Sequence, residues 1–353
     1  MTHIWLRAEE RPNETRVGLT PEGVTALLQD GYQVTVEASP HRVIPDAAYK
    51  ATGAKIAPFG SWPTAPKDAV IFGLKELPSS DAPLHHRHIL FGHAYKGQPD
   101  GLKLLKRFKA GGGTLYDLES LVDPTGKRVA AFGYWAGYAG AAVTLLAWAA
   151  QQRCQELAPL TPYGSEAELR LDVQSALVQA GHTRPTALVI GVKGRVGAGA
   201  TALCTHMGVP VTGWDVEETA HGGPFPEILA HELFFNCILA RPGTPVFVSQ
   251  SATTAPRRLS LIGDIACDPT SDFNPVPLYD AATSWDTPIR TVHTNPGLSI
   301  MAIDNLPSLL PQESSEDFAA QLLPHLRIMG DLDTGPWLEA KRAFEHATSS
   351  FPG

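Results

Sequence analysis

The sequence predicts an α/β protein that is built from doubly wound parallel sheets and divided into two domains. The first observation is the length of 353 residues, roughly twice that of a common single domain. The second is a series of short apolar runs that alternate with helix-like segments in the first third of the chain. The third is another α/β block that begins at 186–190 and continues to about residue 310. Repeated β–α units of this kind are typical of doubly wound sheets.

The elements of the first block follow one another closely. Thr20 and Pro21 suit an N-cap and a first helical residue, so a helix is expected to begin there and to end at Gly31. Another helix is expected near 101–110. Several runs are apolar throughout, as central parallel strands are when both faces are covered. Strands are expected at 4–6, 33–37, 69–73, 88–92 and 114–116.

A long helix is expected over 134–151. Its segment 137–150 is apolar, but it is too short to span a bilayer and rich in small residues, so we expect a buried helix. Further along, Ser165 and Glu168 form a capping-box pattern, which predicts a helix over 166–180. The tail is expected to form one or two helices.

Composition and charge exclude several classes of function. The chain has 36 acidic and 28 basic side chains, and its net charge of -8 argues against nucleic acid as a partner. Charged residues near the N-terminus interrupt any signal-peptide core, so we expect a cytoplasmic protein without a membrane partner. The four cysteines form no CxxC pair, and the run His85-His86-Arg87-His88 has no carboxylate or cysteine at ligand spacing. We therefore expect no metal site and a solvated loop at this run.

The strongest local pattern is A-L-V-I-G-V-K-G-R-V-G-A-G-A at 187–200. An apolar strand runs directly into Gly191, Gly194 and Gly197, and a helical pattern follows. Glycines permit a tight turn and a close backbone approach to a pyrophosphate, which the N–H groups at the helix start can bind. A glycine-rich turn without a ligand is the plainer interpretation.

The next expected strand, over 209–214, supports a dinucleotide site. It leads into Asp215, about 24 residues after Gly191 and close to the interval of about 20 expected for a ribose-binding carboxylate. A carboxylate there binds ribose hydroxyls and repels a 2′-phosphate, which favours NAD over NADP. The basic loop residues Lys193 and Arg195 weaken this preference, and a simple turn aspartate is the other interpretation.

Two potential acid–base groups follow neighbouring strands. Lys75 stands in G-L-K-E-L-P after one apolar run, and His93 follows the next. Ligands of open α/β sheets bind beyond the carboxyl ends of the strands, so both side chains are expected at one edge. Lysine and histidine suit proton transfer because burial and neighbouring charges tune their pKa values. Taken singly, an exposed lysine and a capping histidine are the plainer interpretations.

Three further charged residues stand near these positions. Arg16 precedes the first helix and Arg128 precedes the long helix, and each is a candidate for holding a substrate carboxylate. Glu119 follows the strand expected at 114–116 and is a candidate for tuning a neighbouring cation. Each is equally compatible with a surface position or a structural ion pair. No G-x-S-x-G and no Walker motif occurs, so serine hydrolases and P-loop nucleotidases have no support.

The start of the chain, L-R-A-E-x-x-P-x-E-x-R-x-x-L-T-P, resembles the superfamily of alanine dehydrogenases and transhydrogenases. Within it, the chain is more similar to the fungal-type saccharopine dehydrogenases, which are NAD-dependent and lysine-forming. The segments that carry this resemblance occur in family order over nearly the whole chain. They are G-L-K-E (73–76), H-A-Y-K (93–96), G-T-L-Y-D-L-E (113–119), R-V-A-A-F-G (128–133), W-D-V-E-E-T with G-G-P-F (214–225), and I-D-N-L-P-S-L-L-P (303–311).

The resemblance implies a reaction that belongs to lysine biosynthesis. NAD takes a hydride from the carbon that bears the secondary amine of saccharopine, and the resulting imine is hydrolysed to L-lysine and 2-oxoglutarate. Lys75 and His93 resemble the acid–base pair of the family. Glu119 and Glu76 resemble carboxylates that tune the pKa values of this pair.

The resemblance also implies binding residues. Arg16 and Arg128 resemble the residues that hold substrate carboxylates. Asp304, in I-D-N-L-P, is expected near the nicotinamide. The cofactor-binding set that follows from the resemblance and the glycine pattern is Gly191, Gly194, Arg195, Val196, Gly197, Asp215 and Asp304.

The fold that the resemblance implies is two Rossmann-like domains with the active site in the cleft between them. Residues 1–134 and 320–353 are expected to form the catalytic domain, and residues 135–319 the NAD-binding domain. In that fold the C-terminal tail packs back onto the first domain. A monomer or small homo-oligomer is expected.

Two alternatives to this reaction remain open, the first because some residues depart from the family pattern. His221 stands where an arginine is expected, and Val196 stands where some relatives carry cysteine. A related opine-type or alanine dehydrogenase, with another pair of amino acid and 2-oxo acid, is therefore a second hypothesis. A non-catalytic NAD-binding sensor is a third, although Lys75, His93 and Glu119 together argue against it, since a sensor needs no acid–base pair.

Overall fold

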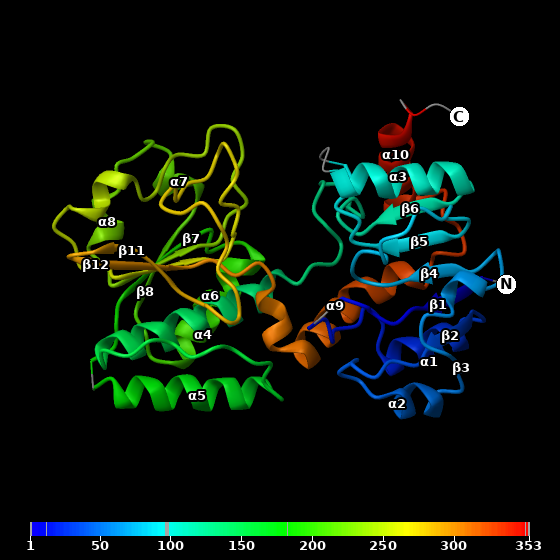
Figure 1. The fold of residues 1–353 in the computed structure, drawn as a ribbon, viewed down its shortest axis with the longest axis horizontal. Helices are drawn as coiled ribbons and strands as arrows, with labels where there is room; N and C mark the ends of the chain where they lie inside the picture. Colours follow the sequence, from blue (N-terminus) through cyan, green and yellow to red (C-terminus); the bar gives the residue numbers. More distant parts are fainter. Residues whose placement is uncertain (1, 12, 96–98, 182, 350, 352–353) are drawn as a thin grey trace. The chain divides into compact units, whose positions relative to one another are not determined.

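The computed structural model of the chain divides into two compact units (Figure 1). The first unit comprises Met1–Ala131 and Pro311–Gly353, and the second comprises Phe132–Leu310. The chain thus leaves the first unit once and returns to it for its last two helices. The residues that the structure describes are 2–11, 13–95, 99–181, 183–349 and 351.

The first unit is built on a six-stranded sheet in which every neighbouring pair is parallel. Its strands, in spatial order, are β3 (Lys55–Ala57), β2 (Gln33–Glu37), β1 (His3–Leu6), β4 (Val70–Phe72), β5 (Arg87–Leu90) and β6 (Thr114–Asp117). Its helices are α1 (Pro21–Gln29), α2 (Asp46–Ala51), α3 (Pro99–Gly111), α9 (Pro311–Leu326) and α10 (Gly335–Thr348), with a 3₁₀ turn at Trp62–Thr64. All five strands expected in this block are present. Strand β3 and helix α2 were not predicted from the apolar pattern.

Two local signals in this unit act as expected. The Thr20 hydroxyl accepts the N–H of Gly23 and caps α1. Every residue of β4 is fully buried, as the uniformly apolar run predicts for a central parallel strand. Because all the strands are parallel, the loops that follow β1, β4, β5 and β6 meet at the same edge of the sheet. This edge positions the residues predicted for acid–base chemistry.

The second unit contains another six-stranded sheet, parallel except at one edge strand. In spatial order its strands are β11 (Arg290–Thr294), β12 (Gly297–Met301), β10 (Leu261–Asp264), β9 (Leu233–Asn236), β7 (Ala187–Ile190) and β8 (Val211–Trp214), and β11 pairs antiparallel with β12. Its helices are α4 (Gly133–Gln152), α5 (Glu166–Gln179), α6 (Arg195–His206), α7 (Val216–Thr219) and α8 (Pro226–Leu229), with 3₁₀ turns at Gln250–Thr253 and Leu306–Leu309. The predicted class, two doubly wound α/β sheets, is confirmed.

Alternate side chains of β7 fill two different cores. Val189 faces the core built from α4, α5 and α6, whereas Leu188 and Ile190 face the core on the other side of the sheet. All residues of α4 from Gly137 to Ala150 are buried, so the prediction of a buried helix is confirmed. Among the described residues no helix is long and apolar enough to cross a membrane.

The expectation of a solvated loop at His85-His86-Arg87-His88 is wrong. Only His85 is exposed, while His86 is buried and His88 has an exposed fraction of 0%. The reason is that β5 begins at Arg87 and lies inside the sheet. The His88 ring packs edge-on against Trp62 and Phe108, with centroid distances of 5.2 and 5.3 Å. Within the described chain, neither of its ring nitrogens has a hydrogen-bond partner.

His88→Leu is expected to stabilise the protein, and more strongly at low pH. Burial, aided by the charges of Arg7, His86 and Arg107, holds the pKa of His88 well below its usual value of 6.5. Only the unfolded state therefore gains this proton as the pH falls below 6.5, so the native histidine loses stability there. We expect the substitution to raise the unfolding free energy by about 2 kcal/mol at pH 5 and by less at pH 7.5. Urea denaturation at the two pH values measures both.

The matched control for this experiment is His41→Leu, at an exposed position of the same unit. That change should leave the pH dependence of stability as it is in the natural chain. If His88→Leu unfolds with the same pH dependence as the natural protein, His88 does not carry the acid sensitivity.

Candidate active site and dinucleotide site

The three residues predicted for acid–base chemistry gather at the carboxyl edge of the first sheet. Lys75 follows β4, His93 follows β5 and Glu119 follows β6, and these strands are neighbours in the sheet. Glu119 raises the pKa of the His93 imidazole, and the charge of Lys75, which lies within electrostatic range, opposes that rise. The strand order therefore brings together groups that lie far apart in the sequence.

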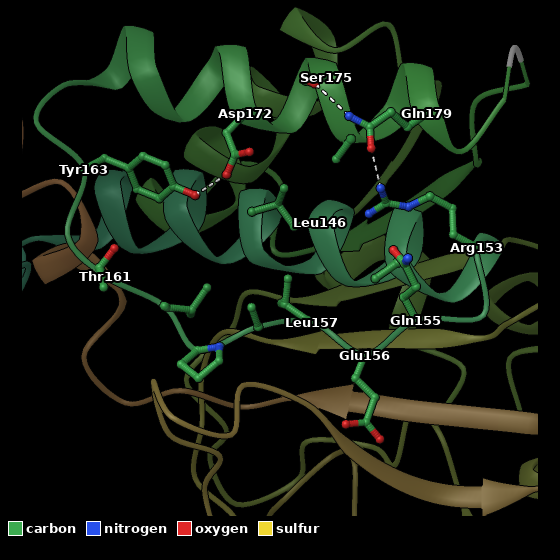
Figure 2. A pocket seen from close by; sticks show the side chains of 15 residues that line it. Leu146, Arg153, Gln155, Glu156, Leu157, Thr161, Tyr163, Asp172, Ser175 and Gln179 are labelled. Carbon is green, nitrogen blue, oxygen red and sulfur yellow. Dashed lines mark hydrogen bonds between the residues drawn. The ribbon is translucent and has the colours of Figure 1, made fainter.

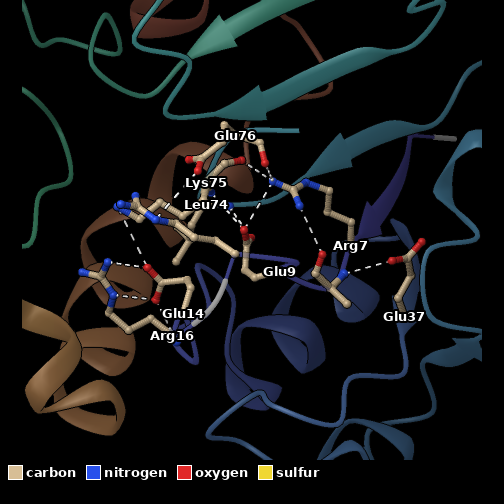
Figure 3. Close-up of polar contacts among 10 residues, drawn as sticks. Arg7, Glu9, Glu14, Arg16, Glu37, Leu74, Lys75 and Glu76 are labelled. Carbon is tan, nitrogen blue, oxygen red and sulfur yellow. Dashed lines mark hydrogen bonds and ion pairs between the residues drawn. The ribbon is translucent and has the colours of Figure 1, made fainter. Parts of the chain in front are cut away.

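The backbone around Lys75 is held by a buried ion pair from the loop after β1 (Figure 3). The Glu9 carboxylate accepts the N–H groups of Leu74 and Lys75 at 2.6 and 3.0 Å, and it pairs with Arg7 at 3.3 Å. Arg7 in turn donates to the carbonyl of Lys75. Its guanidinium lies against Gly73, where a Cβ atom would come within 2.4 Å of Arg7 Nε. Lys75 thus projects from a fixed main chain.

Glu14 lies beside the Lys75 ammonium at the centre of a second polar cluster (Figure 3). Its carboxylate accepts two hydrogen bonds from Arg16, at 2.8 and 2.6 Å, and lies 4.0 Å from Lys75 Nζ. Burial by itself would raise the pKa of Glu14, but the hydrogen bonds from Arg16 and the charge of Lys75 outweigh burial and lower it. The side chains of Glu14 and Arg16 are almost wholly buried. Glu14 was not predicted, although E-x-R before a helix is the signal for such a pair.

Arg16 therefore has a bidentate partner inside the protein, and its role toward a substrate carboxylate stays a prediction. Glu76, directly after Lys75, points to the surface and lies 3.8 Å from Arg11. Arg128 is exposed, in a turn that the Val122–Arg128 bridge closes. Arg16 thus shares the Glu14 carboxylate with Lys75, whereas Glu76 pairs with Arg11.

His93 and Glu119 form an ion pair in which the imidazole is half exposed. Nδ1 of His93 lies 3.5 Å from Oε1 of Glu119. The contact with Glu119 raises the pKa of His93, against the opposing effect of partial burial. His93 has a φ of 46°, in the left-handed region that non-glycine residues rarely adopt, so the turn after β5 is held by its surroundings. Asp117, at the end of β6, is a buried neighbour of this pair that the sequence analysis missed.

A pocket of about 570 Å³ opens beside His93 in the first unit. Its walls carry charges of both signs, from Glu76 and Asp100 and from Lys103 and Arg107. A second pocket, of about 530 Å³, lies in the second unit between α4, α5 and the segment 155–163 (Figure 2). None of the predicted site residues lines that second pocket. Of these two pockets, the one beside His93 combines space for a small molecule with a predicted catalytic group.

The glycine loop of the second unit has the shape of a pyrophosphate cradle. Gly194 is the N-cap of α6, and Gly191 has a φ of 92°. A Cβ atom on Gly197 would lie 2.1 Å from the carbonyl oxygen of Gly191, so the turn admits no side chain there. Arg195 and Val196 open the helix, and their N–H groups belong to the first turn that an anion can bind. The loop therefore fits a dinucleotide.

Asp215 follows β8 and connects this loop to the next helix. Its carboxylate caps α7 by accepting the N–H of Val216 at 2.9 Å, and its other oxygen accepts the N–H of Lys193 at 3.2 Å. It is thus both a turn aspartate and a neighbour of the glycine loop, as a ribose-binding carboxylate must be. Asp304 is exposed, between β12 and the 3₁₀ turn at Leu306–Leu309. No cluster of three or more potential metal ligands occurs among the described residues.

Comparisons with known proteins place the chain among related sequences and folds. Residues 5–139 match the family model of the alanine dehydrogenase/PNT N-terminal domain. The chain is 43% identical to saccharopine dehydrogenase [NAD(+), L-lysine-forming] of Schizosaccharomyces pombe, over 97% of each chain. It is 45% identical to the protein of that name from Emericella nidulans, over 99% of this chain and 98% of the other. In fold it is similar to the solved structure of an L-alanine dehydrogenase, with a TM-score of 0.65, 17% identity and coverage of 97% and 93%.

Proposed function

Because the chain belongs to the family of NAD(+)-dependent, L-lysine-forming saccharopine dehydrogenases, we propose that Lys75 and His93 are its acid–base groups. The resemblance found in the sequence motifs is confirmed. The protein is an oxidoreductase that acts on the CH–NH group of saccharopine and releases L-lysine and 2-oxoglutarate. The observation that supports the proposed roles is the meeting of Lys75 and His93 at one edge of the first sheet.

The chemistry requires proton transfers at one nitrogen and at one water molecule. The secondary amine must lose a proton before its carbon can give up a hydride, so a base must lie beside it. Hydrolysis of the imine then needs a base for the attacking water and an acid for the departing amine of lysine. Two groups that exchange these roles suffice, and Lys75 and His93 are within electrostatic reach of each other.

The neighbouring carboxylates support these two groups differently. Glu14 lies 4.0 Å from Lys75 Nζ and balances its charge when the amine is protonated. Glu119 favours the protonated imidazole of His93. We assign Glu76 to the same acid–base region and Arg16 and Arg128 to the substrate carboxylates, as the family motifs imply.

The second unit holds the cofactor in this proposal. Gly191, Gly194 and Gly197 shape the turn, the helix start at Arg195 and Val196 receives the pyrophosphate, and Asp215 receives the adenosine ribose. Asp304 is assigned to the nicotinamide end. When bound, NAD supplies the acceptor for the substrate hydride. The cytoplasm as its compartment, and a monomer or small homo-oligomer as its state, are further parts of the proposal.

The test of this function is NADH oxidation, followed by near-ultraviolet absorbance, in the presence of L-lysine and 2-oxoglutarate. We expect turnover with both substrates and none when either is left out. Pyruvate with ammonia, and other amino acids with 2-oxoglutarate, serve as comparisons. Turnover with pyruvate and ammonia alone would identify an alanine dehydrogenase, and NADH binding without any turnover would identify a sensor. The relatives do not favour either alternative.

A further inference from the structure

Asp117 occupies a central but hidden place at the edge that carries Lys75 and His93. It is the last residue of β6, pairs in register with Leu90 of β5, and has an exposed fraction of 1%. Its Oδ2 atom faces Gly92, where a Cβ atom would come within 3.0 Å. The carboxyl group therefore lies against the turn that carries His93. It is too deeply buried to contact a substrate directly.

The two oxygens of Asp117 have different partners. Oδ1 accepts the N–H of Glu119 at 2.9 Å and so fixes the turn that carries Glu119. Oδ2 makes no hydrogen bond of ordinary geometry within the described residues, and the same holds for the buried hydroxyl of Tyr95 nearby. The Gly92 N–H still acts on the carboxylate and lowers its pKa, but too weakly to offset burial, so the retention of this buried acid calls for a reason.

The titratable groups that act on Asp117 among the described residues include Glu119 from its own loop, and His93 and Tyr95 from the loop after β5. Burial raises the pKa of Asp117 to about 6 against the backbone hydrogen bonds from Glu119 and Gly92; the charge of Glu119 adds to the rise, and that of His93 opposes it. In return, the pKa of His93 is raised mainly by Glu119, and ionised Asp117 adds to this rise while Lys75 opposes it. Asp117 and His93 thus change charge in neighbouring pH ranges and influence each other.

We propose that Asp117 is a positioning residue for the His93–Glu119 pair, which it serves in two ways. Through Oδ1 it holds the Glu119 backbone, and through the charge on its buried carboxyl group it favours the protonated imidazole of His93. The geometric part of this proposal rests on the contacts around β5 and β6, and its catalytic meaning rests on the function proposed above.

The two roles can be separated by two substitutions. Asp117→Asn keeps an oxygen that accepts the Glu119 N–H but removes the charge. Asp117→Ala removes both the acceptor and the charge. Asp81→Asn is the matched control, because it removes one carboxylate from the same unit at a position whose side chain is 93% exposed.

The first measurement is the NMR titration of the His93 imidazole in the full-length, cofactor-free protein, assigned with a His93→Asn variant. In Asp117→Asn we expect the pKa of His93 to fall by about 0.5 pH unit, the effect of one charge at a partly solvated distance. Asp81→Asn should leave it unchanged. This readout does not depend on turnover, so it remains valid if the proposed function is wrong.

The second measurement is the pH profile of saccharopine oxidation. For Asp117→Asn, the acidic limb of kcat/KM should move to lower pH by the same amount while kcat at its optimum stays close to the natural value. Asp117→Ala should lose about 10- to 100-fold in kcat, because the Glu119 turn is released. An unmoved His93 titration in a folded Asp117→Asn protein would overturn the electrostatic role, and equal kcat in the Ala and Asn variants would overturn the positioning role.

Discussion

Lys75→Met is expected to reduce saccharopine turnover by about 10²- to 10⁴-fold, the usual contribution of a positioned acid–base group. Methionine keeps most of the side-chain volume but can neither accept nor donate the proton. The main chain at this position is fixed by Glu9 and Arg7, so the loop should keep its course. The affinity for NADH should not change, because the glycine loop belongs to the second unit. Steady-state kinetics and NADH fluorescence titration measure the two effects separately.

Lys50→Met is the control for this variant, since Lys50 is exposed in the last turn of α2. It should turn over saccharopine at the natural rate. A Lys75→Met protein that keeps more than a tenth of the natural kcat would remove Lys75 from the acid–base pair and leave His93 with the proton transfers.

Gly197→Ala is expected to weaken NADH binding by at least about 100-fold. The added Cβ would lie 2.1 Å from the carbonyl oxygen of Gly191 and 2.7 Å from Cα of Val192, and both are backbone atoms that cannot rotate away. The turn must therefore open, which moves the N–H groups of the first turn of α6 away from the pyrophosphate. A loss of about 1 to 3 kcal/mol of stability should accompany this change, as overpacking usually costs that much.

Gly297→Ala is the matched control, because Gly297 is the exposed first residue of β12 in the same unit, and the same methyl group there finds only one atom within 4 Å, at 3.9 Å. It should bind NADH as the natural protein does. Natural affinity in Gly197→Ala would mean that the pyrophosphate binds elsewhere than on this loop.

The fold was accessible from the sequence because parallel strands leave a strong apolar signal. Runs such as 69–73 and 187–190 are buried on both faces, so they carry no polar residue that could blur the pattern. The positions of Lys75 and His93 could be predicted for the same reason, because residues that follow neighbouring parallel strands lie at the same edge of the sheet. The glycine pattern was equally readable, because the close approach of Gly197 to Gly191 tolerates no other residue.

The rest depended on contacts that have no sequence period. A strand was expected from residue 88, but the polar run 85–88 gave no sign that the His88 ring packs between Trp62 and Phe108. The pairing of Glu14 with Arg16 is local, but only the fold shows that Lys75 approaches the same carboxylate. Asp117 was not predicted, because it is the last residue of an apolar strand and the functional role was assigned to Glu119, two residues later.

The return of the last two helices to the first unit has a consequence for the order of events on the ribosome. Residues 132–310 are complete, and free to fold as a contiguous domain, before α9 and α10 have been synthesised. The first sheet must wait for them, because Trp337 of α10 packs on Tyr116 of β6 and Ser315 of α9 accepts the N–H of Val17. A chain that stops at residue 310 would thus emerge with a finished second unit and an unfinished first unit. Completion of the first unit is therefore tied to the synthesis of α9 and α10 rather than to the appearance of Lys75 and His93.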